Sequence, residues 1–229
     1  MVVNLFIPSA GLGTRLLPLT ADKPKALVEI NGKPMIQYLL DKFLDNDFLK
    51  IDKIIVNVHH FADLMIDFFG NYDKHKIIIS DEREQLLDTG GGLKQALQIL
   101  KDDKPLLVHN VDIETDFNFP EFLNKKPNDN VLSTLIVSKR ETSRYLLFDD
   151  EMKLCGWKNI KTGESIIVDE KDDLQSFAYS GIQLVNPKLL PLMSSEKVFP
   201  LIPEYLRLAN DINFAGFNSN SYFNDLGKL

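Results

Sequence analysis

The chain has 229 residues, a length that allows one substantial core and that single α/β domains commonly reach. Hydrophobic residues make up 44% of it and charged residues 26%, which is ordinary for a soluble globular protein. The formal net charge of −7 argues against a nucleic-acid-binding surface, whose footprint is a basic patch. With no signal region, no apolar run near the roughly 18 residues of a membrane span, and Cys155 alone, we expect a cytoplasmic protein without a membrane partner.

The first half of the chain alternates between predicted strands and helices. The strands are apolar or rich in β-branched residues, and they span 2–7, 53–59, 76–80 and 105–109. The helices carry apolar side chains at helical spacing, and they span 34–46, 61–70 and 92–100. This alternation predicts βαβ units and a parallel sheet, in which ligands bind beyond the carboxyl ends of the strands.

The second half has a different rhythm. Strands are predicted at 131–137, 145–148, 165–168 and 176–184, and helices at 187–193 and 200–210. The segments 212–217 and 221–225 are predicted to close the chain as a hairpin about 218–220. We find no repeat, low-complexity tract or linker, so a single domain over residues 1–229 is expected.

A glycine-containing loop follows the first strand directly. It holds Gly11, Gly13, Thr14 and Arg15. Glycines let backbone N–H groups approach an anion, while Arg15 and the later Lys25 are the side-chain types that hold phosphate oxygens. The loop lacks the ending of a Walker sequence, and Leu16 replaces the third glycine of a dinucleotide fingerprint. A polyphosphate site is favoured, although a glycine pair after a strand is also typical of a simple tight turn.

The longer pattern around this loop is more specific. It consists of Gly-x-Gly-Thr-Arg, Pro18, Thr20, Pro24-Lys25 and Gly32-Lys33-Pro34. It resembles the signature of the sugar-1-phosphate nucleotidyltransferases, or nucleotide-sugar pyrophosphorylases, and the Thr-Gly-Gly-Gly sequence at 89–92 is similar to the N-acetylmuramate 1-phosphate uridylyltransferase and mannose-1-phosphate guanylyltransferase types. The resemblance implies a single Rossmann-like α/β domain with a mostly parallel central sheet and helices on both faces. Residues 1–112 would form its nucleotide-binding half and 113–229 its sugar-phosphate half, with no C-terminal left-handed β-helix domain.

The same resemblance implies an activity: transfer of a nucleotidyl group from a nucleoside triphosphate to a sugar 1-phosphate, with release of pyrophosphate. Arg15 would steady the β- and γ-phosphates and Lys25 the α-phosphate. Mg²⁺ would be held by Asp112, in Asn110-Val111-Asp112, and by Asp225, in a variant of Trp-x-Asp-x-Gly-Thr. That second motif carries Lys228 in place of threonine, and its sequence is also compatible with a surface turn near a C-terminus. An aspartate that follows a strand, as Asp112 does, is as typical of a turn or a helix cap.

The residues expected to contact nucleotide or sugar lie in several loops. They are Ala10, Gly11, Gly13, Thr14, Glu82, Thr89, Gly90, Asn110 and Gly181. A carboxylate at Glu82 can accept from a ring N–H, so UTP or GTP is predicted over CTP, with UTP first. Read without the resemblance, Glu82 is a solvated loop charge and Gly181 a strand bulge. No lysine of a Glu-Lys-Pro element is evident, which leaves Lys158 and Lys161 as candidates for the sugar phosphate.

Two other classes of function are compatible with parts of this pattern. A non-catalytic nucleotide-sugar sensor would keep the loops but not the metal chemistry, and the joint presence of Arg15, Lys25, Asp112 and Asp225 weighs against it. A nicotinamide oxidoreductase is disfavoured by the missing third glycine. The expected partners are therefore a nucleoside triphosphate and a sugar 1-phosphate, and the expected assembly is a monomer or small homo-oligomer.

Overall fold

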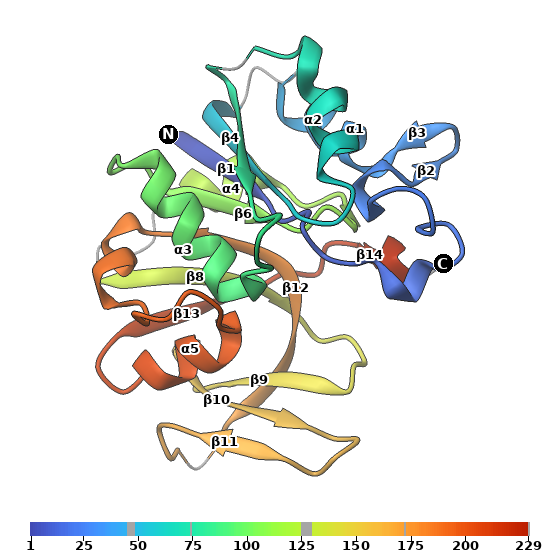
Figure 1. Ribbon diagram of the computed structural model, residues 1–229. Helices are drawn as coiled ribbons and strands as arrows, with labels where there is room; N and C mark the ends of the chain where they lie inside the picture. The colour runs from blue at the N-terminus through green and yellow to red at the C-terminus, as the bar shows by residue number, and fades with distance from the viewer. Residues whose placement is uncertain (45–48, 74, 125–129, 172, 229) are drawn as a thin grey trace.

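The computed structural model describes residues 1–44, 49–73, 75–124, 130–171 and 173–228, and its centre is a large twisted sheet (Figure 1). Within these residues the wide part of the sheet has the order β5-β4-β1-β6-β12-β8-β13. The strands are β1 (Val2–Ile7), β4 (Lys50–Val58), β5 (Ile77–Asp81), β6 (Leu106–His109), β8 (Val131–Ser138), β12 (Gln175–Val185) and β13 (Asn213–Asn218). Only β12 runs antiparallel to its neighbours among them, so the predicted fold class, α/β with a mostly parallel sheet, is confirmed.

Helices cover both faces of this sheet. One core lies between the sheet and α1 (Met35–Leu44), α2 (Ala62–Phe68) and α4 (Phe119–Asn124). The other lies between the sheet and α3 (Asp88–Leu100) and α5 (Leu201–Leu208). Successive side chains of a strand point to opposite faces, and accordingly Leu5 belongs to the first core and Phe6 to the second. Both faces of the central strands are therefore buried, as their near-continuous apolar sequences require.

The long strand β12 also carries an antiparallel extension of the same sheet. Its first residues pair with β9 (Arg144–Phe148), which continues to β10 (Leu154–Asn159) and β11 (Ser165–Ile167), seen at the bottom of Figure 1. The pairing of β12 with β8 shifts register between Tyr179 and Gln183, and Gly181 has a positive φ of 80° there. The bulge interpretation of Gly181 is thus confirmed.

Several predicted boundaries differ from those in the structure. The helix predicted from residue 92 begins at Asp88 instead, because its glycines pack tightly against a neighbouring segment, and tertiary packing overrides their low helix propensity. Pro34 lies in β3 (Lys33–Pro34), which pairs with β2 (Glu29–Ile30), and α1 starts one residue later. Residues 45 and 46 of that predicted helix lie outside the described residues. The segment Pro187–Leu192 is a 3₁₀ helix.

The predicted C-terminal hairpin is wrong. β13 pairs in parallel with β8, whereas β14 (Phe223–Asp225) pairs with β7 (Ile113–Thr115) in a separate two-stranded sheet. The turn-like residues between them allow the chain to leave one sheet and join another, and local sequence does not distinguish this from a hairpin. The consequence is functional, since β7 follows Asp112 and β14 ends at Asp225, so this pairing brings the two aspartates together.

Candidate active site

A cleft of about 490 Å³ opens at the carboxyl ends of β1, β4 and β6, where the parallel sheet was expected to bind its ligand. It contains eight of the predicted site residues. They are Ala10, Gly11, Arg15, Lys25, Glu82, Thr89, Asn110 and Asp112. Gly13, Thr14, Gly90, Gly181 and Asp225 do not line it.

Three charged side chains meet around Gly227 at the mouth of the cleft. Lys25 forms an ion pair with Asp112, and both side chains are largely buried. A Cβ atom placed on Gly227 would lie within 3 Å of Lys25 Nζ, Asp112 Oδ2 and Asp225 Oδ1. The backbone locks this arrangement, since Leu226 N donates to Asp112 O (2.9 Å) and Gly227 N donates to Asp225 Oδ1 (3.0 Å). A larger residue at 227 would push the ends of these side chains apart, so glycine lets two carboxylates and an ammonium converge.

Arg15 extends this charged cluster towards solvent. Its side chain is 59% exposed, and its Nη1 lies 3.6 Å from Asp225 Oδ2. The residue sits in the 3₁₀ turn Thr14–Leu16, which follows Gly13 with its positive φ of 64°. A Cβ on Gly13 would meet Thr20 Cγ2 at 2.9 Å, so Gly13 shapes the loop rather than lining the cleft. A long, exposed guanidinium at the mouth is free to pair with an anionic ligand.

Asn57, at the end of β4, ties the glycine loop to the loop that carries Glu82. Its Oδ1 accepts from Ser9 N (2.6 Å) and Ala10 N (3.2 Å), and its Nδ2 donates to Glu82 Oε1 (2.8 Å). Glu82 Oε2 accepts from Leu87 N (3.1 Å). Asn57 and Glu82 are both buried, so the network is shielded from water and fixes two cleft-lining loops relative to each other.

This network gives Glu82 a structural task. Burial raises the pKa of the Glu82 carboxyl, and the hydrogen bonds from Asn57 and Leu87 N act in the opposite direction. Each carboxylate oxygen already has one protein donor. Glu82 lines the cleft, but its geometry supports positioning of the loop; reading of a base edge by this residue stays a prediction.

The first turn of α3 separates into packing and lining residues. Gly90 N and Gly91 N donate to Phe199 O, and a Cβ on either glycine would collide with the segment 197–199. The structure therefore gives Gly90 a packing role, and its contact with a ligand stays a prediction. Thr89 and Gly92 line the cleft, and Thr89 Oγ1 accepts from Leu201 N (3.0 Å), which ties α3 to α5.

Asn110, which directly follows β6, lies against the bulge of β12. Asn110 N donates to Gly181 O (3.0 Å), and a Cβ on Gly181 would lie 2.7 Å from Asn110 Nδ2. Gly181 thus permits the close approach that lets Asn110 line the cleft, without lining it itself. Lys158 and Lys161 do not line the cleft, and Lys158 Nζ lies over the ring of Tyr145 at 5.9 Å. Their proposed contact with the sugar phosphate has no support from this geometry.

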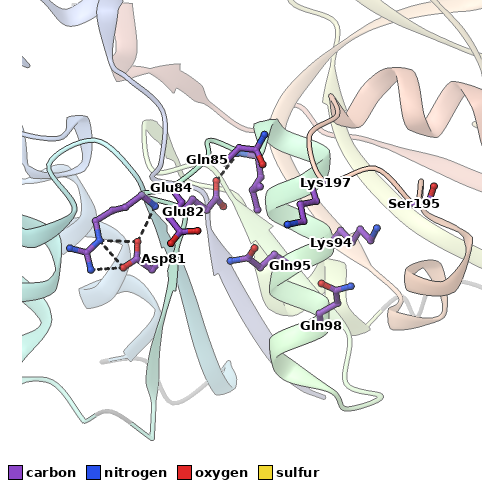
Figure 2. A pocket seen from close by; sticks show the side chains of 12 residues that line it. Asp81, Glu82, Glu84, Gln85, Lys94, Gln95, Gln98, Ser195 and Lys197 are labelled. Atoms are coloured by element: carbon purple, nitrogen blue, oxygen red, sulfur yellow. Dashed lines mark hydrogen bonds and ion pairs between the residues drawn. The ribbon is translucent and has the colours of Figure 1, made fainter.

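A second and larger pocket, of about 780 Å³, lies on the outer side of the Glu82 loop (Figure 2). It is bounded by residues 81–87, one face of α3 and the segment 195–197. Of the predicted site residues only Glu82 borders it, and Arg83 at its edge is bound to Asp81. The chemistry-bearing side chains gather in the smaller cleft, which we therefore treat as the active-site candidate.

In the part of the chain that the structure describes, every helix is too short or too polar to span a bilayer. The same residues include no group of three or more histidine, cysteine, aspartate and glutamate side chains placed to hold a metal ion. A metal at the mouth of the cleft would thus depend on the two aspartates together with ligand oxygens.

The fold and the residues of the cleft together indicate a class of enzyme. Parallel strands end in a glycine loop with an arginine and a lysine, opposite a pair of carboxylates, and this arrangement is typical of enzymes that bind nucleotide phosphates. The chain belongs to the nucleotidyl transferase family, whose model matches residues 6–151. The family resemblance inferred from the glycine loop is therefore confirmed.

Two curated members of the family illustrate which proteins are similar to this chain in sequence. An N-acetylmuramate alpha-1-phosphate uridylyltransferase of Caulobacter vibrioides is 45% identical over 108 residues, covering 45% of this chain and 43% of that protein. A mannose-1-phosphate guanyltransferase of Yarrowia lipolytica is 28% identical over 223 residues, covering 95% of this chain and 59% of that protein. The chain spans about half the length of these curated relatives.

Solved structures with similar folds extend over almost the whole chain. HddC from Yersinia pseudotuberculosis, complexed with GMP-PN, superposes with a TM-score of 0.73 at 21% identity, covering 98% of this chain and 94% of that one. A UDP-glucose pyrophosphorylase complexed with UDP-glucose gives a TM-score of 0.75 at 13% identity, covering 99% and 94%. At these identities the similarity establishes the fold.

Sequence reasoning missed three residues that shape the cleft: Asn57, Gly227 and Gln183. Asn57 lies within the predicted strand 53–59, where a polar side chain among β-branched residues is the one sequence signal of an internal hydrogen-bond network. Gly227 falls in the variant of Trp-x-Asp-x-Gly-Thr, and that spacing does not reveal its steric role. Gln183 gives no sequence signal, since a glutamine within a predicted strand is ordinarily an outward-facing residue.

Proposed function

We propose that this protein transfers a nucleotidyl group from a nucleoside triphosphate to a sugar 1-phosphate and releases pyrophosphate. The observation that carries the proposal is the convergence of Lys25, Asp112 and Asp225 around Gly227, beside the exposed Arg15. These four charged groups lie at the mouth of a cleft whose interior is mainly apolar. Such a division suits a ligand with a polyphosphate at one end and ring systems at the other.

The residues present fit a divalent cation such as Mg²⁺. Asp112 Oδ2 and Asp225 Oδ1 approach each other beside Gly227, and Mg²⁺ in proteins takes one or two carboxylates, with phosphate oxygens and waters completing its shell. Asp112 and Asp225 would hold the metal, which supplies charge neutralisation at the α-phosphoryl group and orients the reacting oxygens.

Two basic side chains of the protein bind and orient the phosphates by their position and charge. Lys25, which forms an ion pair with Asp112, would contact an α-phosphate oxygen of the bound triphosphate. Arg15 reaches from the rim to the β- and γ-phosphates and stabilises the charge that develops on departing pyrophosphate. No covalent intermediate is needed, because the sugar phosphate oxygen is itself the nucleophile.

The nucleotide is proposed to be UTP first and GTP second. The similarity to an N-acetylmuramate alpha-1-phosphate uridylyltransferase supports UTP, while the longer but weaker similarity to mannose-1-phosphate guanyltransferases keeps GTP as the alternative. The direct test is a matrix of the common nucleoside triphosphates against plain and acylamido sugar 1-phosphates, read by pyrophosphate release with and without Mg²⁺. Magnesium-dependent release with UTP supports the proposal, and no release with any pair contradicts it.

A further inference from the structure

The two aspartates at the mouth of the cleft are held by a very small sheet. β7 and β14 have three residues each and form a two-stranded sheet separate from the large one. Asp225 lies opposite Ile113, and Asp112 directly precedes Ile113. A two-stranded ladder is at best marginally stable by itself. The position of Asp225 relative to Asp112 therefore depends on the contacts that fix the ends of this ladder.

The end of the ladder remote from the aspartates is closed by two adjacent side chains. Thr115 Oγ1 donates to Tyr222 O (2.6 Å), and Tyr222 N donates to Asp116 Oδ1 (2.8 Å). Both backbone groups of Tyr222 are thus bound, whereas its side chain is 55% exposed. We call these two hydrogen bonds the Tyr222 clip. The clip holds the backbone immediately before β14, the strand that ends at Asp225.

The clip is anchored to the main fold through Thr115. Lys42, in the last turn of α1, donates from Nζ to Thr115 O (2.7 Å). Thr115 Oγ1 also accepts from Phe117 N (3.1 Å) while it donates to Tyr222 O. Because a hydroxyl has a single proton, these two bonds together fix its direction. The clip therefore connects the C-terminal segment, in a defined orientation, to a helix that covers the large sheet.

The other side-chain contacts of this segment are less directional. Asn224 Nδ2 lies 3.3 Å from Glu114 Oε2 at an exposed position, which is long for an N–H···O hydrogen bond. Phe223 and Leu226 pack against the core that includes α1. Apolar burial is favourable but has no preferred direction, so it holds the segment down without setting its register. The Tyr222 clip supplies the directional constraint at this end of the ladder.

We propose that Thr115 and Asp116 are positioning residues for the carboxylate pair at the mouth. By holding Tyr222 they fix the register of β14 on β7, which keeps the Asp225 carboxylate beside Asp112. The inference rests on the proposed function, in which these two carboxylates bind Mg²⁺. A slip of one residue turns every side chain of a strand to the opposite face, which would move Asp225 away from Asp112. Loosening the clip should therefore weaken metal binding without removing a ligand.

The test compares three variants. Thr115→Val has nearly the same shape without the hydroxyl, Thr115→Ser keeps the hydroxyl, and Thr162→Val is the matched control. Thr162 Oγ1 donates to Glu164 Oε2 (2.7 Å) between β10 and β11, and neither residue lines the cleft.

The first measurement is hydrogen exchange of the amides of residues 222–228 in the metal-free protein. We expect exchange to be about 3- to 10-fold faster in Thr115→Val, because one hydrogen bond of the clip is lost. Thr115→Ser and Thr162→Val should exchange as the wild type does in this segment, and β1 and β6 should be unaffected in all three variants. Exchange of residues 222–228 at the wild-type rate in Thr115→Val overturns the inference.

The second measurement is the dependence of pyrophosphate release on Mg²⁺, with the substrate pair that the wild type uses best. We expect Thr115→Val to raise the Mg²⁺ concentration at half-maximal rate by about 3- to 10-fold, with most of the lost rate recovered at saturating Mg²⁺. Thr115→Ser should restore the wild-type dependence. A lower maximal rate with an unchanged Mg²⁺ dependence would give Thr115 a general structural role and overturn the inference.

A further variant covers the case in which Thr115→Val fails to fold. Asp116→Ala removes the other bond of the clip at an exposed residue, and the same faster exchange and higher Mg²⁺ requirement are expected. Absence of pyrophosphate release by the wild type with every substrate pair contradicts the proposed function. Release with a normal Mg²⁺ dependence in both Thr115→Val and Asp116→Ala contradicts only the positioning role.

Discussion

The mouth and the floor of the cleft are built in opposite ways. The mouth is charged and made of loops, with Arg15 more than half exposed and the Lys25–Asp112 pair supported by residues at the far end of the chain. The floor is apolar and made of strands and helices, with the Gln183 amide held by two buried hydroxyls. Charged and apolar surfaces thus occupy different parts of one cavity.

This separation has a physical basis. Phosphate and metal are recognised by charge, which acts through flexible side chains and a few backbone N–H groups, so a loop motif is sufficient. A neutral substituent is recognised by shape and by one well-placed hydrogen bond, which requires a rigid, desolvated surface. Substitutions at the mouth should therefore affect all substrates alike, and substitutions at the floor should affect them selectively.

The largest effect should come from the carboxylates at the mouth. Asp112→Asn and Asp225→Asn each remove a hard-oxygen ligand, and turnover should fall roughly 1,000-fold or more for every substrate pair, because metal charge stabilisation contributes several kcal/mol. Steady-state pyrophosphate release measures the loss, and circular dichroism checks the fold. Glu114→Gln, at an exposed carboxylate on neighbouring β7, is the control and should retain activity. Full activity with an unchanged magnesium response in either aspartate variant would disprove the assignment.

Arg15→Ala should have the next largest effect. Loss of one donor to developing charge typically costs roughly 2.7–4 kcal/mol, equivalent to about 100- to 1,000-fold in kcat. Stability should remain unchanged, since the side chain is exposed and its ion pair with Asp225 spans 3.6 Å. Arg144→Ala, at an exposed arginine on β9, serves as the control. A variant with altered stability and normal turnover would reduce the glycine loop to a structural element.

Substitutions of Asn57 test the hydrogen bonds that link the glycine loop to the loop carrying Glu82. Asn57→Ala leaves Ser9 N, Ala10 N and Glu82 Oε1 without their partner, so the free energy of unfolding should fall by between about 1 and 3 kcal/mol. Asn57→Asp keeps an acceptor for the two N–H groups but places a carboxylate against Glu82, and its loss should be larger at pH 8 than at pH 5. Urea unfolding at both pH values measures this. Equal stability of Asn57→Ala and wild type would remove the network from the account of the site.

The smallest effect is expected from substitution of His109. This residue follows the cleft-lining Val108 on β6, and its side chain lies on the opposite face of the sheet. Burial among Phe43 and Phe119 lowers the pKa of His109 to about 3, from an ordinary value of 6.5. Between these values the unfolded chain binds a proton that the folded protein does not, so stability is lost as the pH falls. The contribution between pH 7 and pH 5 is about 2 kcal/mol.

Replacement of this histidine should remove that part of the pH dependence. His109→Phe should unfold in urea with a smaller difference between pH 7 and pH 5 than the wild type shows, while the sugar preference stays unchanged. An unaltered pH dependence would mean that His109 takes up a proton in the folded state. A changed sugar preference would mean that the two faces of β6 are not independent.

The sequence by itself determined the family, the fold class and most of the charged residues. Arg15 and Lys25 can be predicted because the proposed phosphate site is local: a strand, a glycine loop and two cations lie within one continuous stretch. The alternating strands and helices are readable because each element buries a periodic apolar face. These features depend on neighbours along the chain, and pattern analysis captures them.

Tertiary structure alone decided how distant residues meet. The pairing of β14 with β7, in place of the expected hairpin, brings Asp225 to Asp112, because strand exchange between sheets is governed by long-range hydrogen bonds. The packing of α3 against Phe199 assigned Gly90 and Gly91 to close contact between segments. Gln183 became a floor residue through hydroxyls contributed by β8 and α5, 50 and 22 positions away. Periodicity reports which face of an element is buried, whereas the hydrogen-bond partners of a buried amide come from distant segments that only folding brings together.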